Sequence, residues 1–328
     1  MADNSKQGFL NSLFQWTVKN TAAEPTTTSD LKPMDESSKS WLNNALENLT
    51  VNPVERLKLC ISKIKDNQTS EQQKKEFLDE LCHWAEELDL AKDFFTIGGL
   101  DILAPLLDSN NDDVRIQACS LLANLVQNHE HCQRIIVQSG LQQKLLNIVS
   151  DSNNPDLKTK AVTAISALIR GYTLGQLQLQ KYHGVKVLIE AIPSSIPRLQ
   201  NKLCFLINTL CSSSAHMKKI FYENNALAEF IRLFNSESCP DHQHTLETIL
   251  TLSSAKVNAM SSVAESDPLL VEAFLEKLTE RRQIIQDSED HLDEINIINQ
   301  IRTLLTPTST EDKLVPEMET NQNIVPIS

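Results

Sequence analysis

The segment Leu199-Gln-Asn-Lys-Leu-Cys-Phe-Leu-Ile-Asn-Thr-Leu210 decides the fold, because its apolar pattern recurs along the chain. Within it, Leu203, Ile207 and Leu210 are spaced by four and then three residues, which places them on one stripe of an α-helix. Three other segments carry the same stripe, with intervals of 42 or 43 residues between successive copies: Ala118-Leu122-Leu125, Ala161-Ile165-Leu168 and Thr245-Ile249-Leu252. The chain therefore contains a tandem helical repeat.

A shorter apolar helix is expected ahead of each stripe. These helices open at Gly99-Leu100, Gly140-Leu141, Gly184-Val185 and Asn225-Ala226, at spacings of 41, 44 and 41 residues. A period of about 40–47 residues is typical of armadillo and HEAT repeats, which bury their apolar faces only by stacking on one another. We therefore expect an all-α fold: an armadillo-like, right-handed superhelical solenoid of about four to five three-helix repeats with helical caps.

Composition changes divide the chain into three regions. Residues 1–40 are expected to be a flexible segment, because the stretch 21–39 is rich in Thr, Ser, Pro and acidic residues and cannot bury enough apolar area to order itself. Residues 306–328 contain three prolines among polar residues and are expected to be a disordered tail. The repeat domain should span 41–305, with clear repeats at about 86–128, 129–171, 172–213 and 214–254 and a two-helix C-terminal cap at 268–305.

Both ends of the repeat domain should carry a buried face of their own. At the N-terminal end we expect it to consist of Phe77, Leu78, Leu81, Trp84 and Leu88. At the C-terminal cap we expect it to consist of Ile284, Ile285, Leu292, Ile295, Ile298 and Ile301.

Charge and glycine content exclude several classes of function. The 328-residue chain has a net charge of −13, so nucleic acid and anionic membrane surfaces should repel it. It has only seven glycines, and Gly98-Gly99 fits neither GxGxxG nor GxxxxGK[ST]. Loops that cradle phosphates need clustered glycines, so we expect no nucleotide site of these kinds and no cofactor.

The positions of the cysteines and histidines also argue against disulfides, a metal site and a catalytic site. The seven cysteines form no CxxC pair, and we see no secretory signal and no apolar run of about 18 residues, so we expect a reducing, cytoplasmic (cytosolic) location. His129, His131 and Cys132 lie at a turn where their side chains should diverge, so we expect no metal site. With no HExxH or nucleophile-elbow motif, we expect a non-enzyme and a monomer.

The third helix of each repeat should line the concave side of the solenoid. Positions about 100° from the core stripe should face the groove and bind a partner: Gln117, Asn124, Lys160, Lys202, Phe205, Thr209 and Glu247. Lys160 and Lys202 occupy the same column in successive repeats and would meet a partner's carboxylates, although they can equally be solvated lysines. Phe205 can be partly buried between repeats, the interpretation we favour slightly, or contact the partner.

Four segments, in this order, resemble the Hsp70-binding protein 1/Fes1 family. They are Leu81-Cys-His-Trp-Ala-Glu-Glu-Leu-Asp-Leu-Ala-Lys-Asp-Phe94, Lys158-Thr-Lys-Ala-Val-Thr-Ala-Ile-Ser-Ala-Leu-Ile-Arg170, the segment 199–210 quoted above, and residues 276–305 with Arg281-Arg282-Gln283. The resemblance covers roughly residues 41–305. Lys202 and Arg170 match basic positions of the family, Asn124 matches the common armadillo asparagine, and Gly171 to Gly175 departs from the family's polar turn.

The resemblance implies a function without a catalytic residue. It implies a cytosolic co-chaperone, a nucleotide-exchange factor that embraces one lobe of the Hsp70 nucleotide-binding (ATPase) domain. The nucleotide cleft then loosens, ADP leaves, ATP binds and the client protein is released. The family also suggests a mobile N-terminal segment that helps to release clients, formed here by Phe9, Leu13 and Trp16, although these residues can equally form a loosely docked helix.

Three alternatives stay open at this point. An importin-like receptor would need tryptophans along the groove, whereas Trp16, Trp41 and Trp84 lie outside the four clear third helices. A general armadillo adaptor without exchange activity is compatible with every repeat, because a fold does not fix a partner. An enzyme is the weakest of the three.

Overall fold

The computed structural model describes residues 52–66, 68–286 and 289–305, and these ranges contain seventeen α-helices, α3 to α19, and no strand. The regions predicted at 1–40 and 306–328, with Phe9, Leu13 and Trp16, lie outside the described residues. None of the helices in the described ranges is long and apolar enough to cross a membrane. An all-α repeat fold is confirmed, while the handedness of the superhelix stays a prediction.

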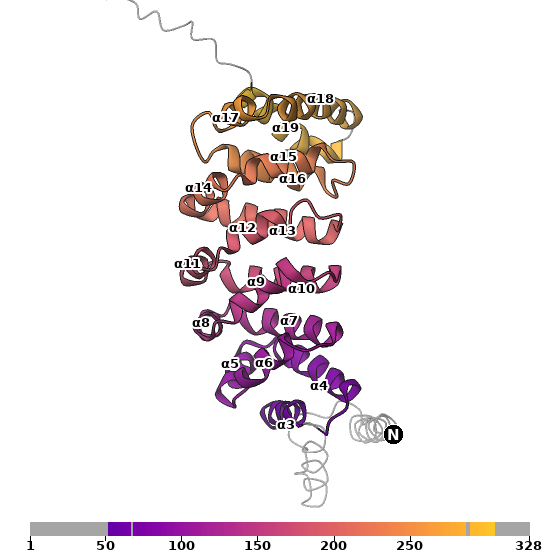
Figure 1. Cartoon of the computed structure of the whole chain (residues 1–328), viewed down its shortest axis with the longest axis vertical. Helices are drawn as coiled ribbons and strands as arrows, with labels where there is room; N and C mark the ends of the chain where they lie inside the picture. The colour runs from indigo at the N-terminus through magenta and orange to yellow at the C-terminus, as the bar shows by residue number, and fades with distance from the viewer. Residues whose placement is uncertain (1–51, 67, 287–288, 306–328) are drawn as a thin grey trace, which may run out of the picture. The chain divides into compact units, whose positions relative to one another are not determined.

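The helices of residues 53–305 fall into three sets that alternate along the chain (Figure 1). The first helices are α5 (Leu88–Thr96), α8 (Glu130–Ser139), α11 (Thr173–Lys181), α14 (Ala215–Glu223) and α17 (Ala259–Ser266). The second helices are α3 (Pro53–Lys65), α6 (Leu100–Leu107), α9 (Leu141–Asp151), α12 (Gly184–Glu190), α15 (Ala226–Asn235) and α18 (Pro268–Ile285). The third helices are α4 (Glu71–Trp84), α7 (Asp112–Val126), α10 (Pro155–Ile169), α13 (Pro197–Ser213), α16 (His242–Ser253) and α19 (Leu292–Leu305), the last preceded by a 3₁₀ turn at Glu289–His291.

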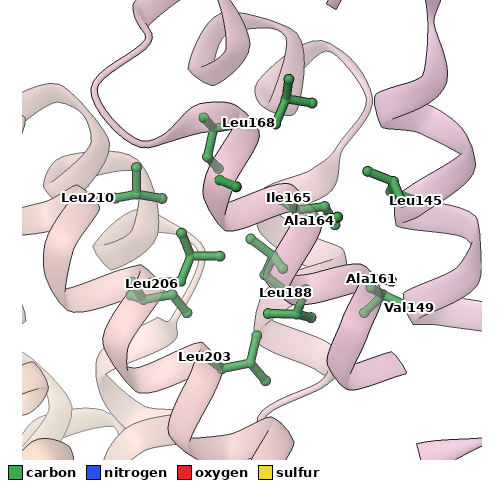
Figure 2. Packing of buried hydrophobic residues seen from close by; sticks show 14 of the residues in the cluster. Leu145, Val149, Ala161, Ala164, Ile165, Leu168, Leu188, Leu203, Leu206 and Leu210 are labelled. Atoms are coloured by element: carbon green, nitrogen blue, oxygen red, sulfur yellow. The ribbon is translucent and has the colours of Figure 1, made fainter. Parts of the chain in front are cut away.

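The third helices stack on one another in chain order, from α4 through α7, α10, α13 and α16 to α19. The apolar stripe read from the sequence forms their inner side, since all twelve of its residues are buried. Figure 2 shows α10 enclosed by its neighbours: Leu145 and Val149 of α9, Leu188 of α12, and Leu203, Leu206 and Leu210 of α13. Stacking therefore supplies the core that one repeat alone cannot build.

Polar caps set the start of the third helices. The Asn111 side-chain oxygen accepts a hydrogen bond from the Asp113 backbone N–H at 2.9 Å, and Asn154 accepts from Asp156 at 3.0 Å. Asp241 does the same for His244, at 3.0 Å. These side chains satisfy backbone donors that have no partner inside a helix.

A single residue in the left-handed conformation separates the first helix from the second in four repeats, whereas Asp267 between α17 and α18 has φ of −144°. The four left-handed residues are Gly98, Gly140, His183 and Asn225, with φ of +83°, +78°, +54° and +72°, at intervals of 42, 43 and 42 residues. The sequence pattern placed the junction one residue later in two repeats. Gly184 has another role: a Cβ there would lie 2.4 Å from the Leu179 Cδ1 atom.

The C-terminal end contains more than the expected two-helix cap. The helix α17 precedes α18 and α19, while α18 contacts α15 and α19 contacts α16, as a complete repeat would. Among the expected core residues of this end, Ile285, Ile298 and Ile301 are buried, and Ile295 is half-buried. Ile284 and Leu292 are 75% and 59% exposed, so their predicted burial is wrong. Ile284 points away because its neighbour Ile285 takes the inward position.

The N-terminal end has one comparable discrepancy. Leu78 and Leu81 are buried and Phe77 and Trp84 half-buried, as the predicted face requires. Leu88 is 58% exposed, so its predicted burial is wrong. It is the first residue of α5, whose inward side is instead formed by Leu90, Ala91 and Phe94.

Candidate partner-binding surface

The solvent side of the stacked third helices forms a continuous row of polar side chains, which we call the ladder face. It lies about 100° around each helix from the buried stripe. Its side chains are at least partly exposed: Gln72, Glu76, Asp79 and His83 on α4 and, in the turn after it, Glu86; Gln117, Ser120 and Asn124 on α7; Lys160, Thr163 and, just after the helix, Arg170 on α10; Arg198, Lys202, Phe205 and Thr209 on α13; His244, Glu247 and Thr251 on α16.

The α4 part of the ladder face is acidic. Glu76, Asp79, His83 and Glu86 are exposed and follow one another by three or four residues, opposite the buried side of α4. Asp79 accepts a hydrogen bond from Gln117. Glu76 and Glu86 have no ion-pair partner within the part of the chain that the structure describes.

The α7 part is uncharged, and its amides already serve the contact with α4. Gln117 Nε2 donates to Asp79 Oδ1 at 2.6 Å. Asn124 Nδ2 donates to the backbone carbonyl of Cys82 at 2.9 Å. Both predicted binding residues therefore fix the register between two helices, and a partner would meet only their remaining polar atoms.

The α10 and α13 parts are basic. Lys160, Arg198 and Lys202 are exposed, and none has an ion-pair partner among residues 52–66, 68–286 and 289–305. Asp156 lies one turn before Lys160 without pairing with it. The chain carries 43 acidic and 30 basic side chains, so leaving these cations unpaired on one surface exposes a rare positive area. A cation without an internal partner is available to a carboxylate on another protein.

Phe205 is the apolar side chain at the centre of this basic area. Its side chain is 46% exposed, and the Arg170 guanidinium of the preceding repeat lies 5.5 Å from the ring centroid. Such cation–π contacts are worth about 0.5–1 kcal/mol at exposed sites. On the same helix Thr209 Oγ1 donates to the Phe205 carbonyl at 2.7 Å. The ring is thus held between repeats with one side open to solvent.

The α16 part is again polar and internally paired. Glu247 accepts a hydrogen bond from Gln243 at 3.1 Å. His244 Nδ1 lies 2.8 Å from Asp241 Oδ2. Glu247 is therefore less available to a partner than the unpaired lysines are.

The thiols beneath the ladder face are poor nucleophiles. Burial raises the pKa of Cys82 and of Cys119 to about 12. Since the thiolate is the reactive form, neither side chain is activated at neutral pH. No group of three potential metal ligands comes together in the described ranges.

The structure brings four of the predicted binding residues together, namely Lys160, Lys202, Phe205 and Thr209 on two adjacent helices. Gln117 and Asn124 lie one helix further toward the N-terminus, and Glu247 one helix further toward the C-terminus. Whether they bind a partner stays a prediction. Arg198 and the acidic row on and just after α4 were not predicted from the sequence, although Glu76, Asp79, His83 and Glu86 follow one another by three or four residues, as one helix face requires.

Comparisons with known proteins bear on what this surface binds. The sequence profile described as "Nucleotide exchange factor Fes1" matches residues 10–94, and the profile "SIL1/FES1/HPBP1 C-terminal domain" matches residues 90–229. Hsp70-binding protein 1 of Rattus norvegicus is 24% identical over 320 residues, which cover 93% of this chain and 88% of that protein. The chain belongs to the Fes1/Hsp70-binding protein 1 family.

Other relatives agree with membership of the Fes1/Hsp70-binding protein 1 family. Hsp70-binding protein 1 of Homo sapiens is 24% identical over 93% of this chain and 87% of that protein. Nucleotide exchange factor SIL1 of Mus musculus is 27% identical over 169 residues, which cover 51% of this chain and 36% of that protein.

Solved structures support the armadillo fold of this Fes1-family chain. A designed armadillo repeat protein covers 76% of this chain with a TM-score of 0.59 and 16% identity. Another, solved in complex with the peptide (KR)4, covers 76% with a TM-score of 0.60 and 17% identity. At these identities the likeness concerns the fold alone.

Proposed function

We propose that this chain is a nucleotide-exchange factor for an Hsp70-family chaperone and that it binds the ATPase domain of that chaperone through the ladder face. Membership of the Fes1/Hsp70-binding protein 1 family carries the proposal. The surface suits it, because Lys160, Lys202 and Arg198 are cations without internal partners beside the open ring of Phe205. An aromatic side chain with arginine beside it and a polar rim around it is typical of protein-binding surfaces.

The activity follows from differential binding and needs no catalytic side chain. A binding protein shifts a conformational equilibrium only by its difference in affinity for the two states. If the ladder face fits the open, nucleotide-free ATPase domain better than the closed ADP-bound one, it promotes release of ADP. By linkage, ADP weakens binding of the exchange factor by the same factor. ATP binding then resets the chaperone and releases the client.

The remaining features of the proposal concern the protein's setting. We propose that the chain is a cytosolic, monomeric co-chaperone in protein folding and quality control, that it is not an enzyme, and that it needs neither a metal nor a cofactor. Its cysteines favour a reducing compartment. Phe9, Leu13 and Trp16, which lie outside the described residues, are proposed to assist client release.

Stopped-flow release of a fluorescent ADP analogue from Hsp70 tests the proposal. The wild-type chain should accelerate release many-fold. The double variant Lys160→Glu/Lys202→Glu should bind at least about tenfold more weakly, because like charges placed opposite each other across an interface cost several kcal/mol and about 1.4 kcal/mol is already tenfold. The matched control is Lys63→Glu/Lys92→Glu, which makes the same change in net charge with two exposed lysines of α3 and α5, away from the ladder face and without ion-pair partners among the described residues.

The outcomes separate the proposal from its alternative. Unchanged ADP release with wild-type protein, despite measurable binding to Hsp70, would identify an armadillo adaptor without exchange activity. Equal loss in the Lys63→Glu/Lys92→Glu control would show that only the overall charge matters. An unaffected double variant would remove the ladder face from the interaction.

A further inference from the structure

The ladder face divides into two zones of opposite charge. The anionic zone consists of Glu76 and Asp79 on α4 and Glu86 in the turn directly after it. The cationic zone consists of Lys160 and Arg170 of the α10 region and Arg198 and Lys202 of α13. The uncharged ladder-face residues of α7 lie between them, because α7 contacts both α4 and α10.

Side-chain contacts fix the position of α4, and so of the anionic zone, beside α7. Lys75 Nζ lies 3.0 Å from Asp113 Oδ2, and Asp79 accepts from Gln117 at 2.6 Å. The hydrogen bond from Asn124 to the Cys82 carbonyl adds a third link further along the same two helices. The acidic row therefore lies on the same side of the stack as Gln117, whose equivalent positions in the next two repeats are Lys160 and Lys202.

The two zones lie on helices separated by α7. Packed helices lie about 8–10 Å apart, so the axes of α4 and α10 are separated by roughly 20 Å. Lys160 nevertheless reaches back far enough to act electrostatically on Cys82 of α4, whereas Arg198 and Lys202 lie one helix further away on α13. Because the Debye length at physiological salt is about 8 Å, the carboxylates of the anionic zone and the cations of α13 interact mainly with the partner charges directly opposite them. Such an arrangement contributes more to the orientation of a complex than to attraction at long range.

We infer that the ladder face binds its partner in one polarity, with a basic area of the partner over α4 and an acidic area over α10 and α13. This inference rests on the proposed function and takes the ATPase domain of an Hsp70-family chaperone as the occupant. The unpaired carboxylates of Glu76 and Glu86 would pair with lysine or arginine, and Lys160 and Lys202 with aspartate or glutamate. Phe205 beside the cationic zone would contact an apolar group between the acidic side chains.

Charge reversal separates polarity from overall attraction. The chain is acidic, and Glu76→Lys/Glu86→Lys makes its net charge less negative. If net charge alone governed binding to an acidic partner, this variant would bind more tightly than wild type. Polarity predicts the reverse: this variant and Lys160→Glu/Lys202→Glu should each weaken binding to full-length ADP-bound Hsp70, by about tenfold or more at low salt. Asp79 is left unchanged because it holds Gln117.

The matched control is Glu272→Lys/Glu276→Lys on α18, which changes the net charge by the same amount as Glu76→Lys/Glu86→Lys. Both residues are exposed and have no ion-pair partner in the described ranges. Its affinity should stay within about twofold of wild type, since rim and remote charges contribute little. Equal weakening by this control would overturn the inference.

Carbodiimide cross-linking then determines the orientation of Hsp70 on the ladder face, because this reagent joins carboxylates to amines that are in contact. Glu76 or Glu86 should link to lysines of Hsp70, and Lys160 or Lys202 to its acidic residues, with both sets on one lobe. Unchanged or tighter binding by Glu76→Lys/Glu86→Lys, or links from α4 to no lysine, would overturn the polarity. If wild-type protein neither binds Hsp70 nor accelerates ADP release, the proposed function fails first and the inference with it.

Discussion

The smallest feature that governs this fold is the left-handed residue between the first and second helices of a repeat. Gly140 has φ of +78°, and a Cβ built there meets nothing within 4 Å. The requirement for glycine is therefore conformational and not steric. Asn225 fills the equivalent place with φ of +72°, and asparagine is one of the few residues other than glycine that adopt this conformation readily.

Gly140→Ala should destabilise the protein by about 1 kcal/mol. The left-handed conformation costs an ordinary L-residue about 1–2 kcal/mol. Alanine also lowers the conformational entropy of the unfolded chain, which stabilises the folded state but offsets only part of that cost. Gly140→Asn should cost clearly less. Urea unfolding followed by circular dichroism measures both. Wild-type stability in the alanine variant would contradict the conformational explanation.

The glycines also show that the sequence does not reveal which residue adopts the left-handed conformation. Gly99 and Gly184 matched the repeat pattern, yet the left-handed residues are Gly98 and His183. A Cβ on Gly99 would lie 2.5 Å from the Phe94 ring, so this glycine serves close packing. A glycine can serve a positive φ or a close approach, and sequence spacing alone does not distinguish the two.

Among the helices, α3 is tied to α4 by one carboxylate. Arg56 Nη2 donates to Glu80 Oε2 at 2.8 Å, and Trp84 Nε1 donates to Glu80 Oε1 at 3.3 Å. The hydrogen bond from Arg56, against the opposing effect of burial, holds the pKa of Glu80 below its usual value of 4.5, with the bond from Trp84 and the charge of Arg56 adding to it. A carboxyl with a lowered pKa in the folded state stabilises the protein above the unfolded pKa.

Glu80→Gln should therefore cost about 1 kcal/mol at neutral pH, since this pair is partly exposed. The stability difference between wild type and variant should narrow as the pH falls below about 4.5, where the unfolded carboxyl already binds a proton. Urea midpoints at several pH values measure this difference. Glu76→Gln, on the same helix and without an ion-pair partner in the described part, is the control. A gap that stays constant with pH would refute the assignment to Glu80.

Helix prediction succeeded where a long stripe repeats and failed where a helix is short. The third helices were found because four copies of the stripe agree. The helix α17, Ala-Met-Ser-Ser-Val-Ala-Glu-Ser, buries only Ala259, Met260 and Val263. Its polar residues mask this pattern, and only its contacts with α18 and α19 show its place in the repeat.

At the scale of the whole repeat domain, each repeat depends on its neighbours. Phe234 of α15 is fully buried, and its ring packs edge-on against Phe274 of α18 at 5.3 Å between centroids. Arg281 of α18 pairs with the buried Glu294 of α19 through two hydrogen bonds, at 2.7 and 2.9 Å. The last repeat is thus a compact unit that covers the one before it.

Ending the chain after Asn258 should destabilise the rest without unfolding it. A stack of repeats loses one interface at a time, and exposing Phe234 alone should cost about 2 kcal/mol. Circular dichroism should show helix in the remaining repeats, with an earlier urea midpoint. The same truncation with Phe234→Gln controls for aggregation through the uncovered ring. Complete loss of helix would show that the repeats fold only as one unit.

Only part of the ladder face could be predicted from the sequence. The columns through Lys160 and Lys202 followed from repeats that align with one another. The acidic row on α4 did not, because α4 does not carry the stripe that aligns the other repeats, and its register depends on contacts such as the one between Asp79 and Gln117. Sequence periodicity predicts which residues share a helix face, and packing decides how the faces of unlike repeats line up.

The enclosure of α10 has a mechanical consequence. Ala161, Ala164 and Ala167 allow neighbouring helices to approach closely, and the last turns of α10 are buried almost all round. The middle of the stack therefore resists bending more than its ends. When a stiff body is pressed against a compliant one, nearly all of the deformation occurs in the compliant body. A chaperone domain with a hinge, seated on α10 and α13, would thus be the part that yields.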